Sequence, residues 1–164
     1  MIQRIQTVYL IIAIILLTLL ISNPVAEIII SEKLHLVFKF NRIESPTVPE
    51  FNAVSAWPVA VLLFAILLIG LSTIFLYQFR ILQMRLCIFN ILLMFGLAGM
   101  IYFLTKITLK QCNGEESIFL WPIVIPFISI ILTFLAFKGI QKDENLVRSY
   151  DRIRWLLINF WIQE

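Results

Sequence analysis

Four long apolar runs constrain this chain more than any other feature of its sequence. They cover about residues 5–22, 57–79, 86–104 and 118–137, and none contains a charged residue. Each is close to the roughly 20 residues that cross the hydrocarbon core of a bilayer as an α-helix. Lipid offers no hydrogen-bond partners, so uninterrupted apolar runs of this length must be helical. The sequence therefore predicts an all-α membrane protein with four transmembrane helices.

The composition agrees with a chain surrounded by lipid. Of the 164 residues, 61% are hydrophobic and only 14% are charged, against about 25% charged residues in soluble domains. We expect a single membrane domain over residues 1–164, and we expect no binding of nucleic acid. Pro126 lies inside the fourth run and predicts a kink or loosened first turns in that helix.

The basic residues predict the orientation in the membrane. With the N-terminus inside, the inner segments carry a net charge of +4 and the outer segments −1, which agrees with the total of +3. The short turn over residues 78–85 holds Arg80 and Arg85 and no acidic residue. Since cytoplasmic loops are enriched in Lys and Arg, both termini are predicted to be cytoplasmic.

The outer loop over residues 23–56 contains a strand-like pattern. Leu34, Leu36, Phe38 and Phe40 alternate with more polar residues, which is typical of a half-buried strand. The β-branched residues before them predict a second strand, so we expect a small extracytoplasmic β-hairpin over residues 26–42.

The tail over residues 138–164 carries a different pattern. Apolar residues recur in steps of three and four, at Leu146, Tyr150, Ile153, Leu157 and Trp161. This spacing predicts a separate C-terminal amphipathic helix in the cytoplasm, beginning near residue 143. Two interpretations stay open: the helix lies on the anionic inner leaflet or packs under its own bundle, or it is a docking face for a soluble partner.

Catalytic chemistry finds no support in the sequence. The four runs hold no ionisable residue, whereas intramembrane charges are the usual sign of an ion or proton pathway. Nucleophile-elbow, HExxH, P-loop and CxxC motifs are absent. We therefore expect no catalytic residue, cofactor or metal, and no enzyme. Asn90 is the costliest polar residue in the runs, and it is expected to bond to a neighbouring helix rather than to a substrate.

Two stretches together carry a family resemblance. The first is the opening MIQRIQTVYL, and the second is IQKDENLVRS over residues 140–149, followed by Asp151-Arg152-Ile153-Arg154. The pair resembles a bacterial family of four-span membrane proteins catalogued as domain of unknown function 4293, typical of Bacteroidota. The resemblance covers nearly the whole chain but not residues 155–164. It implies a cytoplasmic (inner) membrane location in a Gram-negative envelope, and it implies no activity.

The same resemblance points to polar residues at the inner interface. They are candidate interface or ion-pair residues, either as a cytoplasmic ion-paired cluster or as ordinary structural ion pairs: Arg4, Asp143, Glu144, Arg148, Asp151 and Arg152.

Two functional hypotheses follow from these features. The first is a non-catalytic accessory or scaffold subunit of an envelope complex, with a protein partner on the 26–42 hairpin or the 143–164 tail. The alternative is a small lipid- or solute-handling membrane protein with a groove between its spans, near Pro126 and Asn90.

Overall fold

The computed structural model describes most of the chain. The backbone is described for residues 3–31, 34–44, 54–76, 79–111 and 116–162. Side chains are described for residues 5–29, 36–44, 56–76, 79–111, 117–147 and 149.

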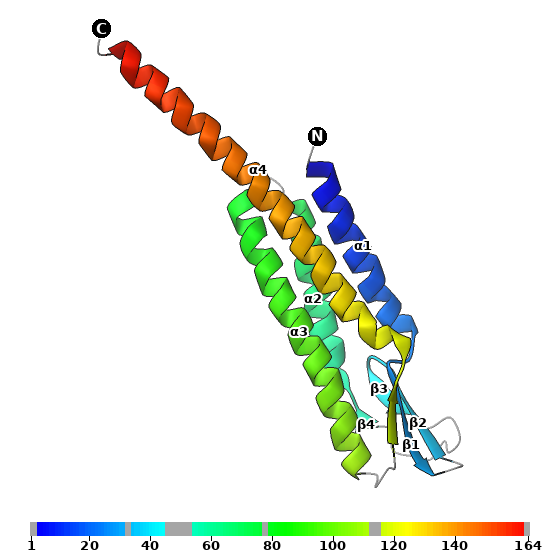
Figure 1. Cartoon of the computed structure of the whole chain (residues 1–164). Helices are drawn as coiled ribbons and strands as arrows, with labels where there is room; N and C mark the ends of the chain where they lie inside the picture. The colour runs from blue at the N-terminus through cyan, green and yellow to red at the C-terminus, as the bar shows by residue number, and fades with distance from the viewer. Residues whose placement is uncertain (1–2, 32–33, 45–53, 77–78, 112–115, 163–164) are drawn as a thin grey trace.

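Four helices form an up-and-down bundle (Figure 1). They are α1 (Gln3–Ser22), α2 (Trp57–Phe75), α3 (Arg80–Gln111) and α4 (Ile125–Ile162), and a 3-10 turn, η1 (Trp121–Val124), precedes α4. α4 packs mainly on α1 and α3, while α2 packs on α3 and more lightly on α1. Each of the four is long and apolar enough to cross a membrane, as the apolar runs predicted.

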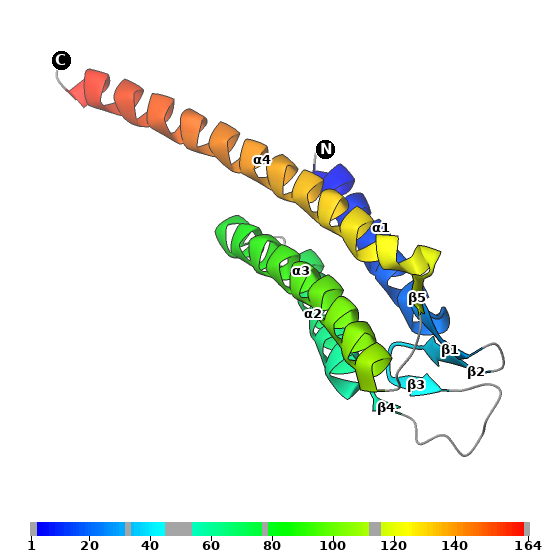
Figure 2. The same cartoon turned by 60° about the horizontal axis from the view of Figure 1, so that its bottom comes forward.

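A small antiparallel sheet covers one end of the bundle, as Figures 1 and 2 show. Its strands are β1 (Ala26–Ser31), β2 (Leu34–Phe38), β3 (Arg42–Glu44), β4 (Val54–Ser55) and β5 (Glu116–Phe119), in the order β4-β3-β2-β1-β5. The predicted hairpin is confirmed as the β1–β2 pair, with Glu27 opposite Val37. We call this end of the bundle the sheet end. The opposite end, where α1 begins and from which α4 extends, is the tail end.

The sheet and the helices share one core at the sheet end. Ile28, Leu36, Phe38 and Ile43 are fully buried on one face of the sheet, in the same apolar cluster as buried residues of α1, α2 and α3. Val37, between Leu36 and Phe38 in β2, lies on the opposite face and is only half-buried. The alternation of apolar and polar residues predicted this division, because successive strand side chains point to opposite faces.

The predicted start of the fourth span, at residue 118, is wrong. Ile118 and Phe119 belong to β5, where they pair with Glu27 and Ala26 of β1. Short apolar runs do not distinguish a strand from a helix by themselves, and the open edge of β1 supplies the backbone partners. The loosened start expected from Pro126 takes the form of the 3-10 turn η1 ahead of α4.

The prediction of a separate C-terminal helix is also wrong. α4 runs without a break over 38 residues, so Asp143 lies inside the helix and does not begin a new one. The polar residues near position 143 are helix formers or are tolerated in an exposed helix, and no Gly or Pro interrupts the chain after Gly139. The turn between α2 and α3 is likewise shorter than expected, since α3 already begins at Arg80.

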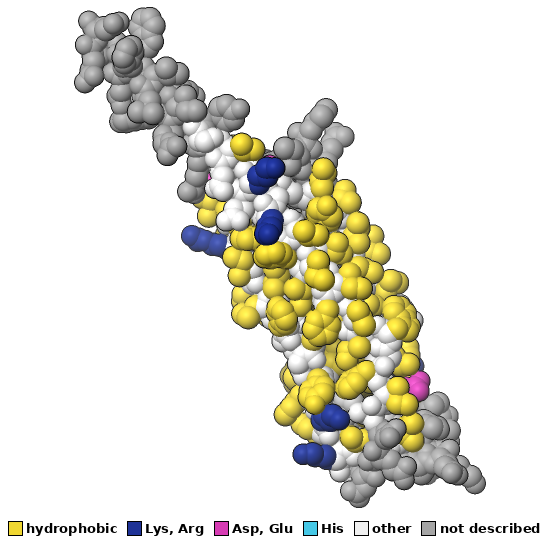
Figure 3. Space-filling model, in the orientation of Figure 1, with side chains coloured by type: hydrophobic (Ala, Val, Ile, Leu, Met, Phe, Trp, Pro, Cys, Tyr) yellow, Lys and Arg dark blue, Asp and Glu magenta, His cyan; other side chains and the backbone are white. Residues whose placement is uncertain are grey.

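The described surface of the bundle is apolar. Exposed fractions reach 59% for Phe64, 66% for Leu92 and 59% for Ile131, while the core contains Thr73, Asn90 and other polar residues. Figure 3 shows the hydrophobic side chains over the middle of the molecule, with Lys and Arg above and below them. A monomeric soluble protein rarely exposes such a surface, so the fold is compatible with a multi-pass membrane protein.

Candidate functional site

A hydrogen bond joins the two ends of the chain at the tail end of the bundle. Gln6 of α1 is 5% exposed, and its Nε2 donates to Oδ2 of Asp143 on α4 at 2.6 Å. The two residues are 137 positions apart in the sequence. A hydrogen bond to an ionised carboxylate is stronger than one between neutral groups, so it stabilises the contact between α1 and α4.

Gly139 allows this close approach. It lies one helical turn before Asp143, and a Cβ atom at this position would be 2.8 Å from Cγ of Gln6. A larger residue would therefore push Gln6 away from α4. We call Gln6, Gly139 and Asp143 the α1–α4 junction.

A second polar contact holds α2 to α3 at the same end. Gln83, near the start of α3, is buried, and its Nε2 donates to the carbonyl oxygen of Thr73 on α2 at 3.1 Å. Carbonyl groups in the last turn of a helix lack a partner within the helix, so Gln83 satisfies one of those of α2.

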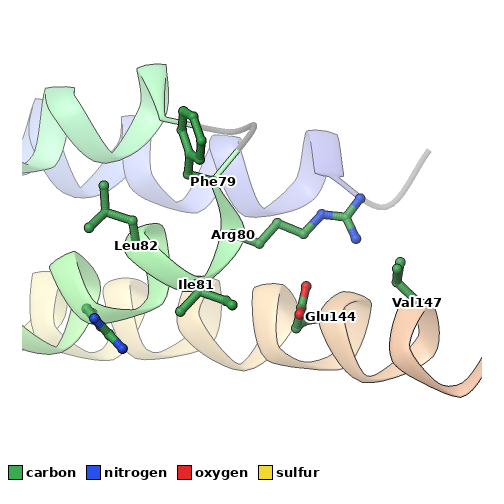
Figure 4. Close-up of a pocket in the computed structure, with 7 residues that line it drawn as sticks. Phe79, Arg80, Ile81, Leu82, Glu144 and Val147 are labelled. Carbon is green, nitrogen blue, oxygen red and sulfur yellow. The ribbon is translucent and has the colours of Figure 1, made fainter. Parts of the chain in front are cut away.

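An open groove lies between the start of α3 and the middle of α4. It has a volume of about 580 Å³ and is lined by Phe79, Arg80, Ile81, Leu82, Arg85, Glu144 and Val147. Figure 4 shows the Arg80 side chain extending beyond the start of α3, on the side of α4 from which Glu144 projects. With two arginines and one glutamate, the lining has a net charge of +1. We call it the arginine groove.

The structure places the predicted interface residues as follows. Asp143 belongs to the α1–α4 junction, and Glu144 lines the arginine groove. The side chains of Arg4, Arg148, Asp151 and Arg152 lie outside the described ones, although their backbone belongs to α1 and α4. The ion-paired cluster therefore stays a prediction. The described residues form ion pairs at the sheet end, where Glu44 contacts Lys39 and Arg42.

Sequence reasoning missed Gln6 and used Arg80 and Arg85 only for topology. The available signal for Gln6 was its place in the first of the two motifs, at the edge of a span. Its contact with the second motif exists only in the folded chain. The arginines had a signal too, because both precede the third apolar run without a nearby acid.

The interior of the bundle holds an uncharged polar layer. Each helix passes from the large apolar cluster to a smaller one at the tail end through a small or polar residue: Ala13, Gly70, Asn90 and Thr133. Among the described residues, Asn90 Oδ1 and Ser129 Oγ are buried without a hydrogen-bond partner. The hydrogen bond expected from Asn90 to a neighbouring helix thus does not involve its oxygen.

The groove expected near Pro126 and Asn90 stays a prediction. Both residues are buried within the bundle, and the arginine groove lies at the tail end instead. No group of three or more His, Cys, Asp or Glu side chains comes together among the described residues.

The fold and the site define a class: a small four-helix protein with an apolar exterior, closed by a sheet at one end and joined by polar contacts at the other. The chain belongs to the family described as Domain of unknown function (DUF4293), whose model matches residues 2–153. The resemblance carried by the two motifs is therefore confirmed, and the match ends just before residues 155–164. No curated protein matches the chain.

Membership in this family gives the junction its context. Gln6 lies in the first of the two motif segments, and Asp143 lies in the second. The structure brings these two residues into contact at the tail end, so the two motif segments meet at the α1–α4 junction.

Proposed function

We propose that this protein spans the cytoplasmic (inner) membrane of a Gram-negative bacterium of the Bacteroidota type, with both termini in the cytoplasm. The exposed apolar side chains along the bundle support insertion. The positions of Arg80, Arg85, Lys138 and Lys142 at the tail end support a cytoplasmic tail end. α1 has 20 residues, or about 30 Å, which matches the hydrocarbon core of a bilayer.

Labelling of cysteines tests this orientation. α3 ends at the sheet end, and Cys112 follows it in the sequence. Cys112 should react with a membrane-impermeant maleimide in intact spheroplasts. A C112S/Q163C variant should react only after the membrane is opened. The reverse pattern would contradict the proposed orientation.

Within the membrane, we propose a non-catalytic role as an accessory or scaffold subunit that presents the end of α4 to a protein partner. The continuity of α4 carries this proposal. Its 38 residues give a length of about 57 Å, close to twice the hydrocarbon thickness. Figures 1 and 2 show α4 continuing well beyond the ends of the other helices.

This continuity favours a partner over the inner leaflet as the contact of the tail. A helix that extends a membrane span without a break leads away from the bilayer, whereas an interfacial helix lies along it. Leu146 and Val147 are already more than 40% exposed, and the apolar spacing continues through Leu157 and Trp161. The apolar face of an amphipathic helix is suited to a groove on another protein.

The tail is a better docking surface than the 26–42 hairpin. β1 and β2 each have a neighbouring strand on both sides, so both edges of each strand are already paired over part of its length. One face of the hairpin is buried against the bundle. The sheet therefore offers less free surface than the extended helix does.

Photo-crosslinking in the full chain in cells tests the docking proposal. A crosslinking residue at Ile153, on the apolar face of the pattern, should give one adduct of fixed mass with a single protein. The matched control at Arg154 lies on the polar face and should give little or none. Equal adducts from both positions, or adducts with lipid alone at Ile153, would contradict a protein-docking face.

A further inference from the structure

The arginine groove combines two kinds of surface. Arg80 is half-buried and Arg85 is exposed, and both come from the first turns of α3. The remaining wall is apolar, and Phe79, Ile81 and Leu82 are 66%, 46% and 43% exposed. These side chains continue the apolar exterior of the bundle up to the two arginines. A ligand in the groove would therefore meet both positive charge and an apolar surface.

The height of the groove along the bundle agrees with a membrane interface. Met84 of α3 and Phe137 of α4 pack on the same apolar cluster at the tail end. Their neighbours Arg85 and Lys138 therefore lie at a similar level. Lys138 and Lys142 line a second hollow of about 510 Å³ on α4. Basic side chains thus flank two sides of α4 where its apolar exterior ends.

We propose that the arginine groove binds the headgroup of an anionic phospholipid from the cytoplasmic leaflet. Arg80 and Arg85 both line the groove, so a phosphate there contacts the planar fork of one arginine, which matches phosphate oxygens in geometry and charge, and is attracted by the charge of the other. The acyl chains lie along the exposed side chains of Phe79, Ile81 and Leu82. This site is separate from the protein-docking role proposed for the end of α4.

The apolar wall distinguishes a lipid from a soluble anion. A free phosphate would use only the arginines and would leave the apolar side chains unaffected, whereas a phospholipid covers both. Basic pockets between transmembrane helices on the cytoplasmic side are suited to anionic headgroups. The groove, with its net charge of +1, attracts an anionic headgroup more strongly than a zwitterionic one. This difference in attraction discriminates between the two kinds of lipid.

Native mass spectrometry of the full chain in a mild detergent tests the proposal. Phosphatidylglycerol and phosphatidylcholine are titrated separately, and the affinity of the first bound lipid is measured. We expect R80Q/R85Q to weaken phosphatidylglycerol binding at least about tenfold, since a charge-assisted contact and a second positive charge are lost, and to weaken phosphatidylcholine binding less, because the choline group cancels the charge of its phosphate. The matched control K106Q/K110Q removes two positive charges on α3 toward the sheet end and should bind phosphatidylglycerol as the unmodified protein does.

Three results would overturn the proposal. One is an equal affinity of R80Q/R85Q and the unmodified protein for phosphatidylglycerol. Another is an equal loss in K106Q/K110Q, which would indicate a general effect of charge. The third is full competition by inorganic phosphate at the concentration of the lipid, which would identify a soluble anion as the occupant.

Circular dichroism checks that the variants fold. If the double variant does not fold, the single variants R80Q and R85Q replace it, and each is expected to weaken binding about threefold. Crosslinking at Ile153 reports on the docking proposal independently.

Discussion

The two ends of the bundle are built in different ways. At the sheet end, five strands close the bundle with backbone hydrogen bonds and a continuous apolar core. At the tail end, side chains such as Gln6 and Gln83 join the helices, basic residues line open hollows, and α4 continues outward. Backbone pairing leaves few groups for a ligand, whereas side-chain contacts around a groove leave several. The difference favours the sheet end as the part that secures the fold and the tail end as the part with the proposed interactions.

The largest effect is expected in the apolar core of the sheet end. Phe38 is fully buried between the sheet and the helices, so Phe38→Ala removes a large side chain and leaves a cavity. We expect a loss of about 3–5 kcal/mol in the free energy of unfolding, measured by denaturant unfolding in detergent micelles. Val37→Ala, on the other face of the same strand and only half-buried, is the matched control. Equal losses from both variants would contradict the core described for this end.

The close approach at Gly139 gives the largest expected effect at the tail end. Gly139→Ala places a Cβ against Gln6 and should destabilise the protein by about 1–3 kcal/mol, the usual cost of overpacking. At Gly99 a Cβ would meet no atom within 4 Å, and Gly99→Ala should be neutral or slightly stabilising because Ala favours the helix. Thermal unfolding of the two variants in the same detergent makes the comparison. If both variants gained stability, the α1–α4 junction would not be close-packed.

The hydrogen bond of the junction should have a measurable but smaller effect. Gln6→Ala removes the donor to Asp143 and should cost about 1–2 kcal/mol, since the acceptor is a carboxylate. A double-mutant cycle with Asp143→Ala isolates the contact. The loss of stability in the double variant should be smaller than the sum of the two single losses by about 1 kcal/mol. Strict additivity in the unfolding measurements would show that the two side chains do not interact.

The smallest effect is expected from the ion pairs on the outside of the sheet. Glu44 contacts Lys39 at 3.2 Å and Arg42 at 2.9 Å, and both cations are more than half exposed. Glu44→Gln should therefore cost less than about 1 kcal/mol, and the difference should shrink further at high salt. A larger loss that persists in 1 M salt would mean that surface charge, rather than the apolar core, holds this end together.

Much of the fold could be predicted because its signals are local. The uncharged runs identified the four helices, and the alternation at Leu36 and Phe38 identified the β1–β2 hairpin. The predicted start of the fourth span at Ile118 was wrong, because a short apolar segment can form a strand as well as a helix. The prediction of a separate tail helix failed because the polar residues near Asp143 resemble a helix boundary, although no Gly or Pro there breaks the helix.

The candidate site was predictable only in part. The family motifs pointed to Asp143 and Glu144, and the topology argument used Arg80 and Arg85. Gln6 was not singled out, because a glutamine at the edge of a span has no local feature that shows where it bonds. Its partner is 137 residues away, and only packing of α1 on α4 brings them together.

Local sequence patterns were enough to predict the four apolar helices, the hairpin between the first two and the basic character of one end. These follow from hydrophobicity and charge, which act on each segment independently of the others. Only the tertiary structure decided that β5 joins the sheet, that α3 and α4 form the arginine groove and that Gln6 meets Asp143. Such features depend on contacts between distant segments, and their free energy is gained only once the helices are already in place.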